Sequence, residues 1–207
     1  MPRQTPPPNQ LDGDKPPEAL GQEYERYIGY LLEKEGWRVI YCGARKGKRD
    51  SGIDLICSKG NIRLLVQCKR WSNRKQIGTD VLDAFLKSIW RYKKKNQPKG
   101  QLGFKVLGAC EIAIGARIYT TTTFEIGFER RAIVEKIKCF ESFPHTSKYP
   151  MIKCHRVRTP RQDLYYLPSD YGYDSVRMNL LDGDQYVWTE DDALTRGFTK
   201  APQRGNP

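Results

Sequence analysis

The sequence predicts an α/β fold, in which helices and strands alternate over residues 18–143 and a small α+β module follows. Several segments carry apolar residues at helical spacing, and short strand-like apolar runs lie between them. After Phe143 the chain becomes polar and proline-punctuated before short apolar runs return. This change in composition indicates that the chain divides into a larger and a smaller unit.

The elements of the larger unit are bounded by glycine, proline or residues that commonly cap helices. Gly36 ends the first helix, and the second helix begins near Thr79 and carries cations at its carboxyl end, as the helix dipole favours. The expected elements are helices over residues 18–35, 79–95 and 124–138 and strands over residues 37–42, 52–56, 64–69 and 112–119.

Composition limits the class of protein. The 207-residue chain has a net charge of +12 and a pI near 9.4, which favours a polyanionic partner such as nucleic acid. It has no apolar run long enough to span a membrane and no apolar core typical of a signal peptide, so no membrane partner is expected. Six cysteines without a C-x-x-C pair fit a reducing compartment. We therefore expect a cytoplasmic protein that binds nucleic acid.

Polar side chains stand on two neighbouring strands. Asp54 precedes the apolar pair Leu55–Ile56, and Gln67 and Lys69 end the next strand. Side chains two residues apart on a strand point to the same side, so Gln67 and Lys69 can converge on whatever Asp54 holds. A carboxylate, a carbonyl oxygen and an ammonium group together suit a hard divalent cation and a phosphodiester.

Each of these residues also has a simpler interpretation, which the sequence leaves open. An acid beside an apolar strand is often a solvated end residue. Gln67 and Lys69 could be ordinary residues of an exposed face. The order of the residues along the chain, rather than any one of them, favours the site.

Together with this motif, further pieces of the chain resemble the Mrr-type restriction endonucleases, a branch of the PD-(D/E)xK nuclease superfamily in which Gln often replaces the second acid. The resemblance covers roughly residues 18–140. It implies a restriction-endonuclease-like core, with a central mixed sheet flanked by helices. The further pieces are Gly21 to Glu25, which looks like the family's G-x-x-F-E helix, then Gly36–Trp37, then Thr120–Thr121 with Phe124 and Ala132.

The resemblance implies a catalytic set of Glu25, Asp54, Gln67 and Lys69. Asp54 would be the central Mg²⁺ ligand, with Mn²⁺ able to substitute, and Lys69 would position water or stabilise developing charge. Gln67 offers only a neutral oxygen, so Glu25 would restore the missing negative charge, with Gly21 leaving room for it. The alternative for Glu25 is an ordinary charge on the helix surface.

We interpret the chain as a metal-dependent endonuclease that hydrolyses phosphodiester bonds in DNA, in restriction or another form of defence. Two alternatives stay open: a structure-selective nuclease of junctions or repair, and a non-catalytic DNA-binding subunit on a nuclease scaffold. Cutting both strands usually needs two sites, which favours a homodimer, although no coiled-coil heptad supports one.

Two basic loops flank the expected site, where the phosphates of DNA would lie. A solvated surface is the alternative for both loops. The residues are Arg45, Lys46, Lys48 and Arg49 before Asp54, and Arg70, Arg74 and Lys75 after Lys69.

The whole chain is expected to consist of a disordered proline-rich leader, a nuclease domain, a linker, a small module and a tail. In the module, short strands are expected over residues 164–168, 176–178 and 186–188. Thr189 begins a helix that Gly197 ends. The five parts are residues 1–17, 18–143, 144–163, 164–201 and 202–207.

The module resembles in part the sunset domains that are appended to bacterial nucleases. Ile152–Lys153, Tyr165 with Pro168, and Gly197–Phe198 fit that pattern, while Tyr166 and Trp188 depart from it. A zinc site is a separate possibility by residue type, although the spacing of its residues matches no common zinc knuckle. Its residues would be Cys139, His145, Cys154 and His155.

Overall fold

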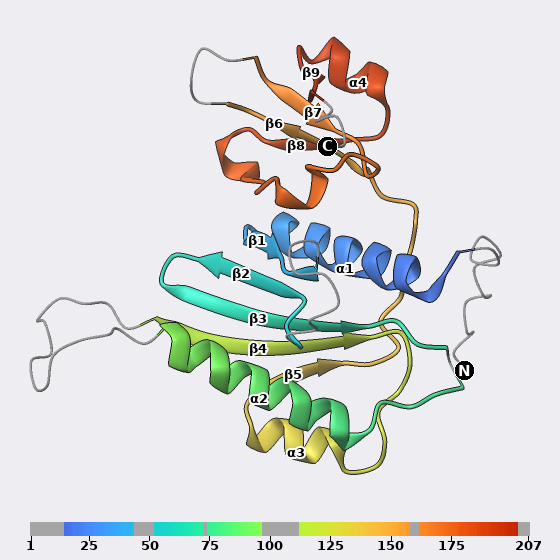
Figure 1. Cartoon of the computed structure of the whole chain (residues 1–207), viewed down its shortest axis with the longest axis vertical. Helices are drawn as coiled ribbons and strands as arrows, with labels where there is room; N and C mark the ends of the chain where they lie inside the picture. Colours follow the sequence, from blue (N-terminus) through green and yellow to red (C-terminus); the bar gives the residue numbers. More distant parts are fainter. Residues whose placement is uncertain (1–14, 44–51, 73, 97–111, 158–161, 203–207) are drawn as a thin grey trace, which may run out of the picture.

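A five-stranded mixed sheet forms the centre of the larger unit, which confirms the expected fold class (Figure 1). The computed structural model describes residues 15–43, 52–72, 74–96, 112–157 and 162–202. The strands lie in chain order, with the first three antiparallel and the last three parallel. They are β1 (Arg38–Tyr41), β2 (Leu55–Lys59), β3 (Ile62–Lys69), β4 (Ala113–Thr120) and β5 (Ile137–Phe140).

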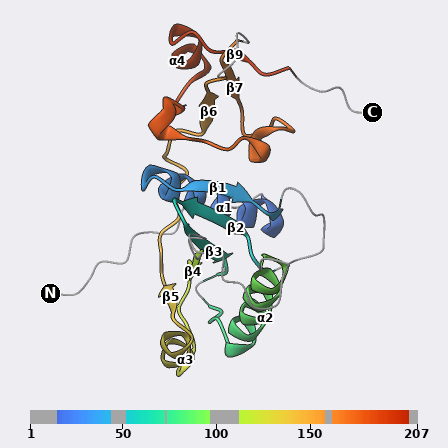
Figure 2. The ribbon, with the colours of Figure 1, turned by 90° about the vertical axis from the view of Figure 1, so that its left-hand side faces the viewer.

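Helices cover both faces of this sheet (Figures 1 and 2). Helix α1 (Pro17–Lys34) packs on one face, and α2 (Thr79–Asn96) and α3 (Phe128–Val134) pack on the other. The apolar stripes of α1 and α2 face the sheet. The helical spacing of their apolar residues therefore reflects burial against the sheet. In the described part of the chain, no helix has both the length and the apolar character to cross a membrane.

Strand β3 is covered on both sides, and its residues are almost continuously apolar for that reason. Leu64, Val66 and Cys68 join the core beneath α1, and Leu65 joins the core beneath α2. Gln67 has the same parity as Leu65, so its side chain lies on the α2 side of the sheet.

The helix expected over residues 124–138 is shorter than predicted. Helix α3 ends at Val134, and the chain then forms β5 from Ile137. Gly127 precedes the helix with a φ of 88°, and Lys136 turns the chain after it with a φ of 57°. Ile137 is apolar because it is buried in the sheet core, and the helical periodicity had counted it as part of the helix.

The small module is built on a second, four-stranded sheet in the order β8-β6-β7-β9. Strand β6 lies inside the segment expected as a linker over residues 144–163, so the module takes in residues from 152 onward. Ile152 and Cys154 are buried in the module's core, which explains the strand. The strands are β6 (Ile152–His155), β7 (Leu164–Tyr166), β8 (Gln185–Val187) and β9 (Thr199–Lys200).

Two other expectations for the module have opposite outcomes. Helix α4 (Glu190–Thr195) begins with the predicted capping box, in which Thr189 Oγ1 accepts the Asp192 N–H and Asp192 accepts the Thr189 N–H. Residues 176–178 form no strand; they follow the 3₁₀ turn η2 (Tyr173–Ser175). Met178 is buried, so its apolar character reflects packing rather than strand pairing.

Helix α1 lies between the two sheets and contacts both (Figures 1 and 2). Its face toward the module carries polar side chains as well as the ring of Tyr30, which contacts Tyr186. Arg26 Nε and Nη2 donate to the two carboxylate oxygens of Asp174 at 2.9 and 2.7 Å, and Arg26 Nη1 donates to the Pro168 carbonyl at 3.1 Å. Gln22 Nε2 donates to the same carboxylate at 3.0 Å. A bidentate pair of this kind fixes the relative orientation of the helix and the module.

A second set of contacts at this junction buries two opposite charges. Glu33 is 2% exposed and Lys153 is fully buried. Glu33 accepts a hydrogen bond from the Tyr186 hydroxyl. The Lys153 ammonium lies 4.4 Å from the ring centres of both Tyr41 and Tyr173. Burial raises the pKa of Glu33 and lowers the pKa of Lys153, so for each group desolvation outweighs the attraction between them.

We predict that Gly29→Ala destabilises the fold. A Cβ on Gly29 would lie 2.6 Å from Cε1 of the buried Tyr41 ring, so overpacking should lower the free energy of unfolding by about 1–3 kcal/mol. Gly21→Ala on the same helix is the control. Among the described residues, nothing beyond its chain neighbours and the backbone of its own helix lies within 4 Å of its Cβ position, and the substitution should be neutral or stabilising by up to about 1 kcal/mol. Urea unfolding measures both, and equal effects would contradict the prediction.

We predict that Glu33 makes stability fall as the pH rises toward neutrality. Burial raises its pKa from 4.5 to about 7, so this group contributes stability below pH 4.5 that is lost as the pH rises through about 7. Glu33→Gln lacks this titration and should gain about 1–3 kcal/mol relative to the parent between pH 5 and pH 8. Urea unfolding at several pH values measures the difference.

Glu18→Gln, at the exposed start of the same helix, is the control. Parallel curves of unfolding free energy against pH for the parent and Glu33→Gln would refute the prediction.

Candidate active site

The backbone of Asp54 is fixed between β1 and β3. Its N–H donates to the Val66 carbonyl at 2.9 Å, and its carbonyl accepts the Cys42 N–H at 2.8 Å. Asp54 itself lies one residue before β2, at the point where the pairing with β3 ends. The Asp54 side chain therefore starts from a rigid position at the edge of the sheet.

The carboxylate of Asp54 reaches across to β3. The Cys68 backbone N–H donates to Asp54 Oδ2 at 2.6 Å. This bond takes the place of a backbone hydrogen bond that would continue the pairing of β2 with β3. Cys68 lies between Gln67 and Lys69 in the sequence. This hydrogen bond thus brings the first acid of the predicted motif against the middle of the Gln67–Cys68–Lys69 triplet.

Glu25 approaches the same stretch of backbone from helix α1. Its Oε2 lies 3.2 Å from where a Cβ on Gly43 would be, and Gly43 follows the residue that bonds the Asp54 carbonyl. The room for Glu25 was expected at Gly21, but nothing lies within 4 Å of the Cβ position there. Gly43 is the glycine that leaves the space.

The charges of three predicted residues act on one buried thiol. The pKa of Cys68 is raised well above its usual value, first by burial and then by the carboxylates of Asp54 and Glu25, while Lys69 opposes these effects. The charges of Glu25, Asp54 and Lys69, which lie in different parts of the chain, therefore all act on Cys68.

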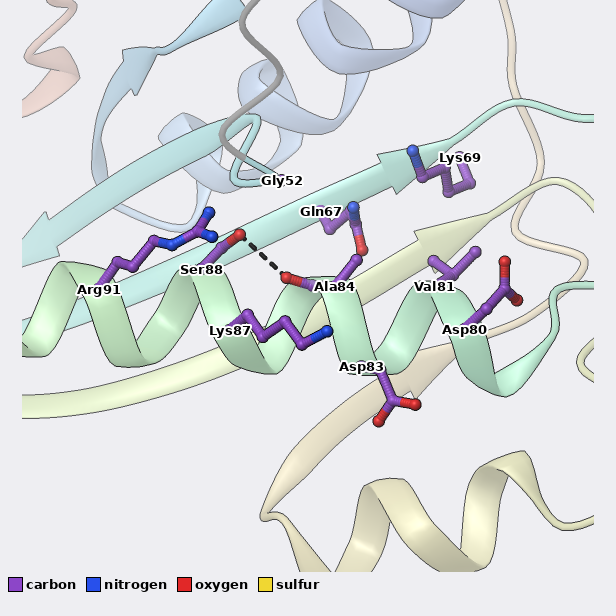
Figure 3. Close-up of a pocket in the computed structure, with 10 residues that line it drawn as sticks. All are labelled: Gly52, Gln67, Lys69, Asp80, Val81, Asp83, Ala84, Lys87, Ser88 and Arg91. Atoms are coloured by element: carbon purple, nitrogen blue, oxygen red, sulfur yellow. Dashed lines mark hydrogen bonds between the residues drawn. The ribbon is translucent and has the colours of Figure 1, made fainter.

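Gln67 occupies the other side of β3. Its side chain points toward α2 and lines a groove of about 500 Å³ together with Lys69 (Figure 3). Gln67 is 2% exposed, and within the described ranges its Oε1 has no hydrogen-bond partner. Asp54 and Glu25 are not among the described residues that line this groove. Lys69 is thus the residue shared by the two parts of the predicted site.

Gly52 fixes the turn that leads into Asp54. It has a φ of 66°, and a Cβ there would lie 2.7 Å from Ser88 Oγ on α2. The Ser88 hydroxyl donates to the Ala84 carbonyl at 3.0 Å, which holds this side chain against the helix (Figure 3). Only glycine accommodates both the positive φ and this close approach without strain.

The groove also contains charged residues of α2 that the sequence analysis missed. Lys87 and Arg91 line it one turn apart, and Asp83, which lines it too, forms an ion pair with Arg131 on α3. Their helical spacing on the polar side of α2 is the signal in the sequence that points to them. The far wall of the groove is therefore a charged helix face, with Lys87 and Arg91 beside two acids, Asp80 and Asp83.

The predicted DNA-binding residues fall in two groups. Arg45, Lys46, Lys48 and Arg49 lie outside the described residues. Among the others, Arg70 Nε donates to His145 Nδ1 at 3.4 Å, and the Lys75 ammonium lies 4.0 Å from the centre of the Trp71 ring. Arg74 is exposed on the same loop.

The threonines after β4 hold this loop in place. Thr121 Oγ1 donates to the Trp71 carbonyl and Thr122 Oγ1 donates to the Lys75 carbonyl, each at 2.8 Å. Thr120 and Thr122 are buried. The threonine run therefore supports the loop that follows Lys69.

The residues considered for zinc do not come together. Cys139 lies on β5 of the first sheet, whereas Cys154 and His155 lie on β6 of the second. His145 packs against the rings of Tyr24 and Tyr27. Among the described residues, no group of three or more His, Cys, Asp or Glu side chains is placed to hold a metal ion. The zinc hypothesis is therefore wrong for this fold.

Comparison with known proteins identifies the larger unit in part. Residues 18–97 match the family model Mrr_cat, described as a restriction endonuclease. A search of curated proteins found no match. One similar solved structure is the protein of unknown function AF1548, with 16% identity and a TM-score of 0.43 over 59% of this chain and 59% of that chain. Another is the MspJI restriction endonuclease in complex with a 27-mer oligonucleotide, with 13% identity and a TM-score of 0.39 over 63% of this chain and 26% of that chain.

In both structures the match spans less than two thirds of the solved chain's length. The family match falls on α1, β1, β2, β3 and α2, the elements that carry or line the candidate site. The resemblance indicated by the sequence motifs is confirmed over this range. Over residues 18–97 the chain is similar to restriction endonucleases of the Mrr kind.

Proposed function

We propose that the chain is a Mg²⁺-dependent endonuclease that hydrolyses phosphodiester bonds in DNA, with a role in restriction or another form of defence. The restriction endonuclease match over residues 18–97 supports the nuclease assignment. The net charge of +12 supports a polyanionic substrate. A homodimer and a cytoplasmic location stay predictions from the sequence.

The observation that carries this proposal is the buried Oε1 of Gln67. A buried carbonyl without a partner costs about 1–3 kcal/mol, and the protein keeps it at the end of the motif strand. An apolar side chain of similar size would avoid that cost. An oxygen ligand held ready for a hard cation gives a functional reason for the cost.

The residues present fit a divalent cation through oxygen donors of mixed charge. The donors on offer are the two carboxylates of Asp54 and Glu25 near the Cys68 N–H and the neutral oxygen of Gln67 on the α2 side of β3, with Mn²⁺ able to replace Mg²⁺. When bound, the cation would polarise a phosphoryl oxygen and make the attacking water more acidic. The hydrogen bond from the Cys68 N–H to Asp54 fixes one carboxylate before any ligand arrives.

Lys69 contributes a charge that does not depend on the cation. It lines the groove with Gln67, and its charge opposes the effect of Asp54 and Glu25 on the pKa of Cys68. From there it orients the attacking water and stabilises the charge that develops on the phosphoryl oxygens. Lys87 and Arg91 on the far wall hold the phosphates on either side of the cleaved bond.

We predict that Asp54→Asn and Lys69→Ala each lower the rate of DNA cleavage by at least about a hundredfold. Asp54→Asn keeps the shape and a hydrogen-bond acceptor for the Cys68 N–H, so it should fold. The assay is conversion of supercoiled plasmid to nicked and linear forms in Mg²⁺ or Mn²⁺, with EDTA as the negative control. Lys93→Ala and Asp191→Asn, at exposed positions, are the matched controls.

Cleavage at the parental rate by both variants would refute the site. Faster cleavage of four-way junctions than of linear duplex would identify a structure-selective nuclease instead. Salt-sensitive DNA binding without cleavage, on methylated as well as unmethylated plasmid, would identify a non-catalytic subunit.

We predict that Gln67→Met separates stability from metal binding. Removing an unpaired buried oxygen should leave the free energy of unfolding unchanged or raise it by about 1 kcal/mol. The parent should gain thermal stability as Mg²⁺ is added, because the ion binds only the folded chain, and the variant should lose that gain. Gln76→Met, at an exposed position, is the control and should keep it. An equal response of parent and Gln67→Met would remove Gln67 from the ligand set.

A further inference from the structure

A second cavity, of about 900 Å³, lies on the small module. None of the described residues that line it also lines the groove beside β3. Its size falls within the range of small-molecule sites, roughly 300–1,000 Å³. Its polar and aromatic lining includes His155, Tyr166, Asp170, Tyr171 and Arg177.

His155 is held in the cavity wall by a buried carboxylate. Its Nδ1 lies 3.0 Å from Asp184 Oδ2, and the Asp184 side chain is 3% exposed. Asp184 also accepts the backbone N–H groups of Arg156 at 2.8 Å and Asn179 at 2.7 Å. Because Nδ1 faces Asp184, Nε2 is the ring nitrogen left for a ligand. The hydrogen bond to Asp184 raises the pKa of His155, which favours the cationic ring.

Tyr171 projects from a loop whose backbone is fixed on both sides. The side chain is 91% exposed. Just before it, Asp170 Oδ2 accepts the Leu167 N–H at 2.7 Å. Two residues later, the buried Tyr173 donates its hydroxyl to the Met151 carbonyl at 2.6 Å. An exposed aromatic ring on such an anchored loop presents a planar apolar surface without further ordering of the backbone.

Tyr166 provides a second ring in the same cavity. It is half-buried, and a Cβ on Gly172 would lie 3.5 Å from its Cε1, so the glycine backbone packs against one edge of the ring. Arg177 lines the cavity and is exposed. Two aromatic rings, a guanidinium and a histidine ring held as a donor are the groups that bind a planar base and a phosphate.

The acids near the cavity have internal partners. Asp170 accepts the Leu167 N–H, and Asp184 is occupied by His155 and two backbone N–H groups. Asp163 pairs with Arg156 and accepts the Val157 N–H at 3.0 Å. Carboxylates that accept hydrogen bonds from the protein's own groups repel an anionic ligand less strongly than exposed carboxylates do. The chemistry of the cavity therefore favours an anion that carries a flat ring.

We propose that this cavity binds a single nucleotide, with the base against Tyr171 and Tyr166 and the phosphate at Arg177 and His155. The nucleotide is either free or one unstacked residue of a nucleic-acid strand, since both present the same groups. The inference does not rest on the proposed nuclease activity, because binding is measured without cleavage.

The test uses the full chain in EDTA, so that no metal-dependent cleavage occurs. Isothermal titration with dAMP, 2′-deoxyadenosine and inorganic phosphate separates the base from the phosphate. Fluorescence anisotropy with a labelled single-stranded oligonucleotide measures the strand form. The variants are Tyr171→Ala and Arg177→Ala, both at exposed positions where the fold should survive. Trp188→Ala, at an aromatic residue of the same module that is 63% exposed and does not line the cavity, is the control.

Saturable binding that Tyr171→Ala weakens by roughly five- to a hundredfold is expected, because one stacked base contributes that much to affinity. Arg177→Ala should weaken binding and reduce the salt dependence by about one phosphate contact. Binding of dAMP identifies a free nucleotide as a ligand, and binding of the oligonucleotide alone identifies a residue within a strand. Absence of binding by both probes, or equal weakening by Trp188→Ala, would overturn the proposal.

Discussion

The ion pair between Arg26 and Asp174 fixes helix α1 between the two sheets, and both parts of the molecule depend on this arrangement. Both side chains are largely buried, with 16% and 8% exposed, so the pair is screened far less than one at the surface. Arg26 follows Glu25 directly in the sequence. The same turn of helix therefore directs one charge to the module and the next to the ends of the motif strands.

Buried polar groups at two places have different explanations. At the junction, Glu33 and Lys153 are costly to bury, and their pKa shifts show that pairing offsets only part of that cost. The pair therefore contributes to the relative orientation of helix α1 and the module rather than to the free energy of unfolding. Few other arrangements of the two parts would keep both buried charges paired. Gln67 has no such structural role. Gln67 lines the groove with Lys69, and its buried oxygen has no hydrogen-bond partner among the described residues.

Two concave sites among the described residues have related chemistry. The groove beside β3 combines Gln67 with three cations, Lys69, Lys87 and Arg91, and with two acids, Asp80 and Asp83. The cavity of the module combines two tyrosine rings with Arg177 and His155. The first set suits the backbone of a nucleic acid and the second suits a base with its phosphate. A chain with a net charge of +12 can use both on one polyanion, because long-range attraction brings the partner to either site.

The sequence by itself determined the elements around the motif, because helical and strand periodicity over α1, β2, β3 and α2 reflects which side each residue buries. It also determined the order Glu25, Asp54, Gln67 and Lys69, and through that order the kind of domain. Only the tertiary structure decided where helix α3 stops, that β6 joins the module, and that Gly43 rather than Gly21 admits Glu25. These outcomes depend on contacts between residues far apart in the chain. The spacing of apolar residues shows which positions are buried. It does not show which distant residues they pack against, so it cannot predict such contacts.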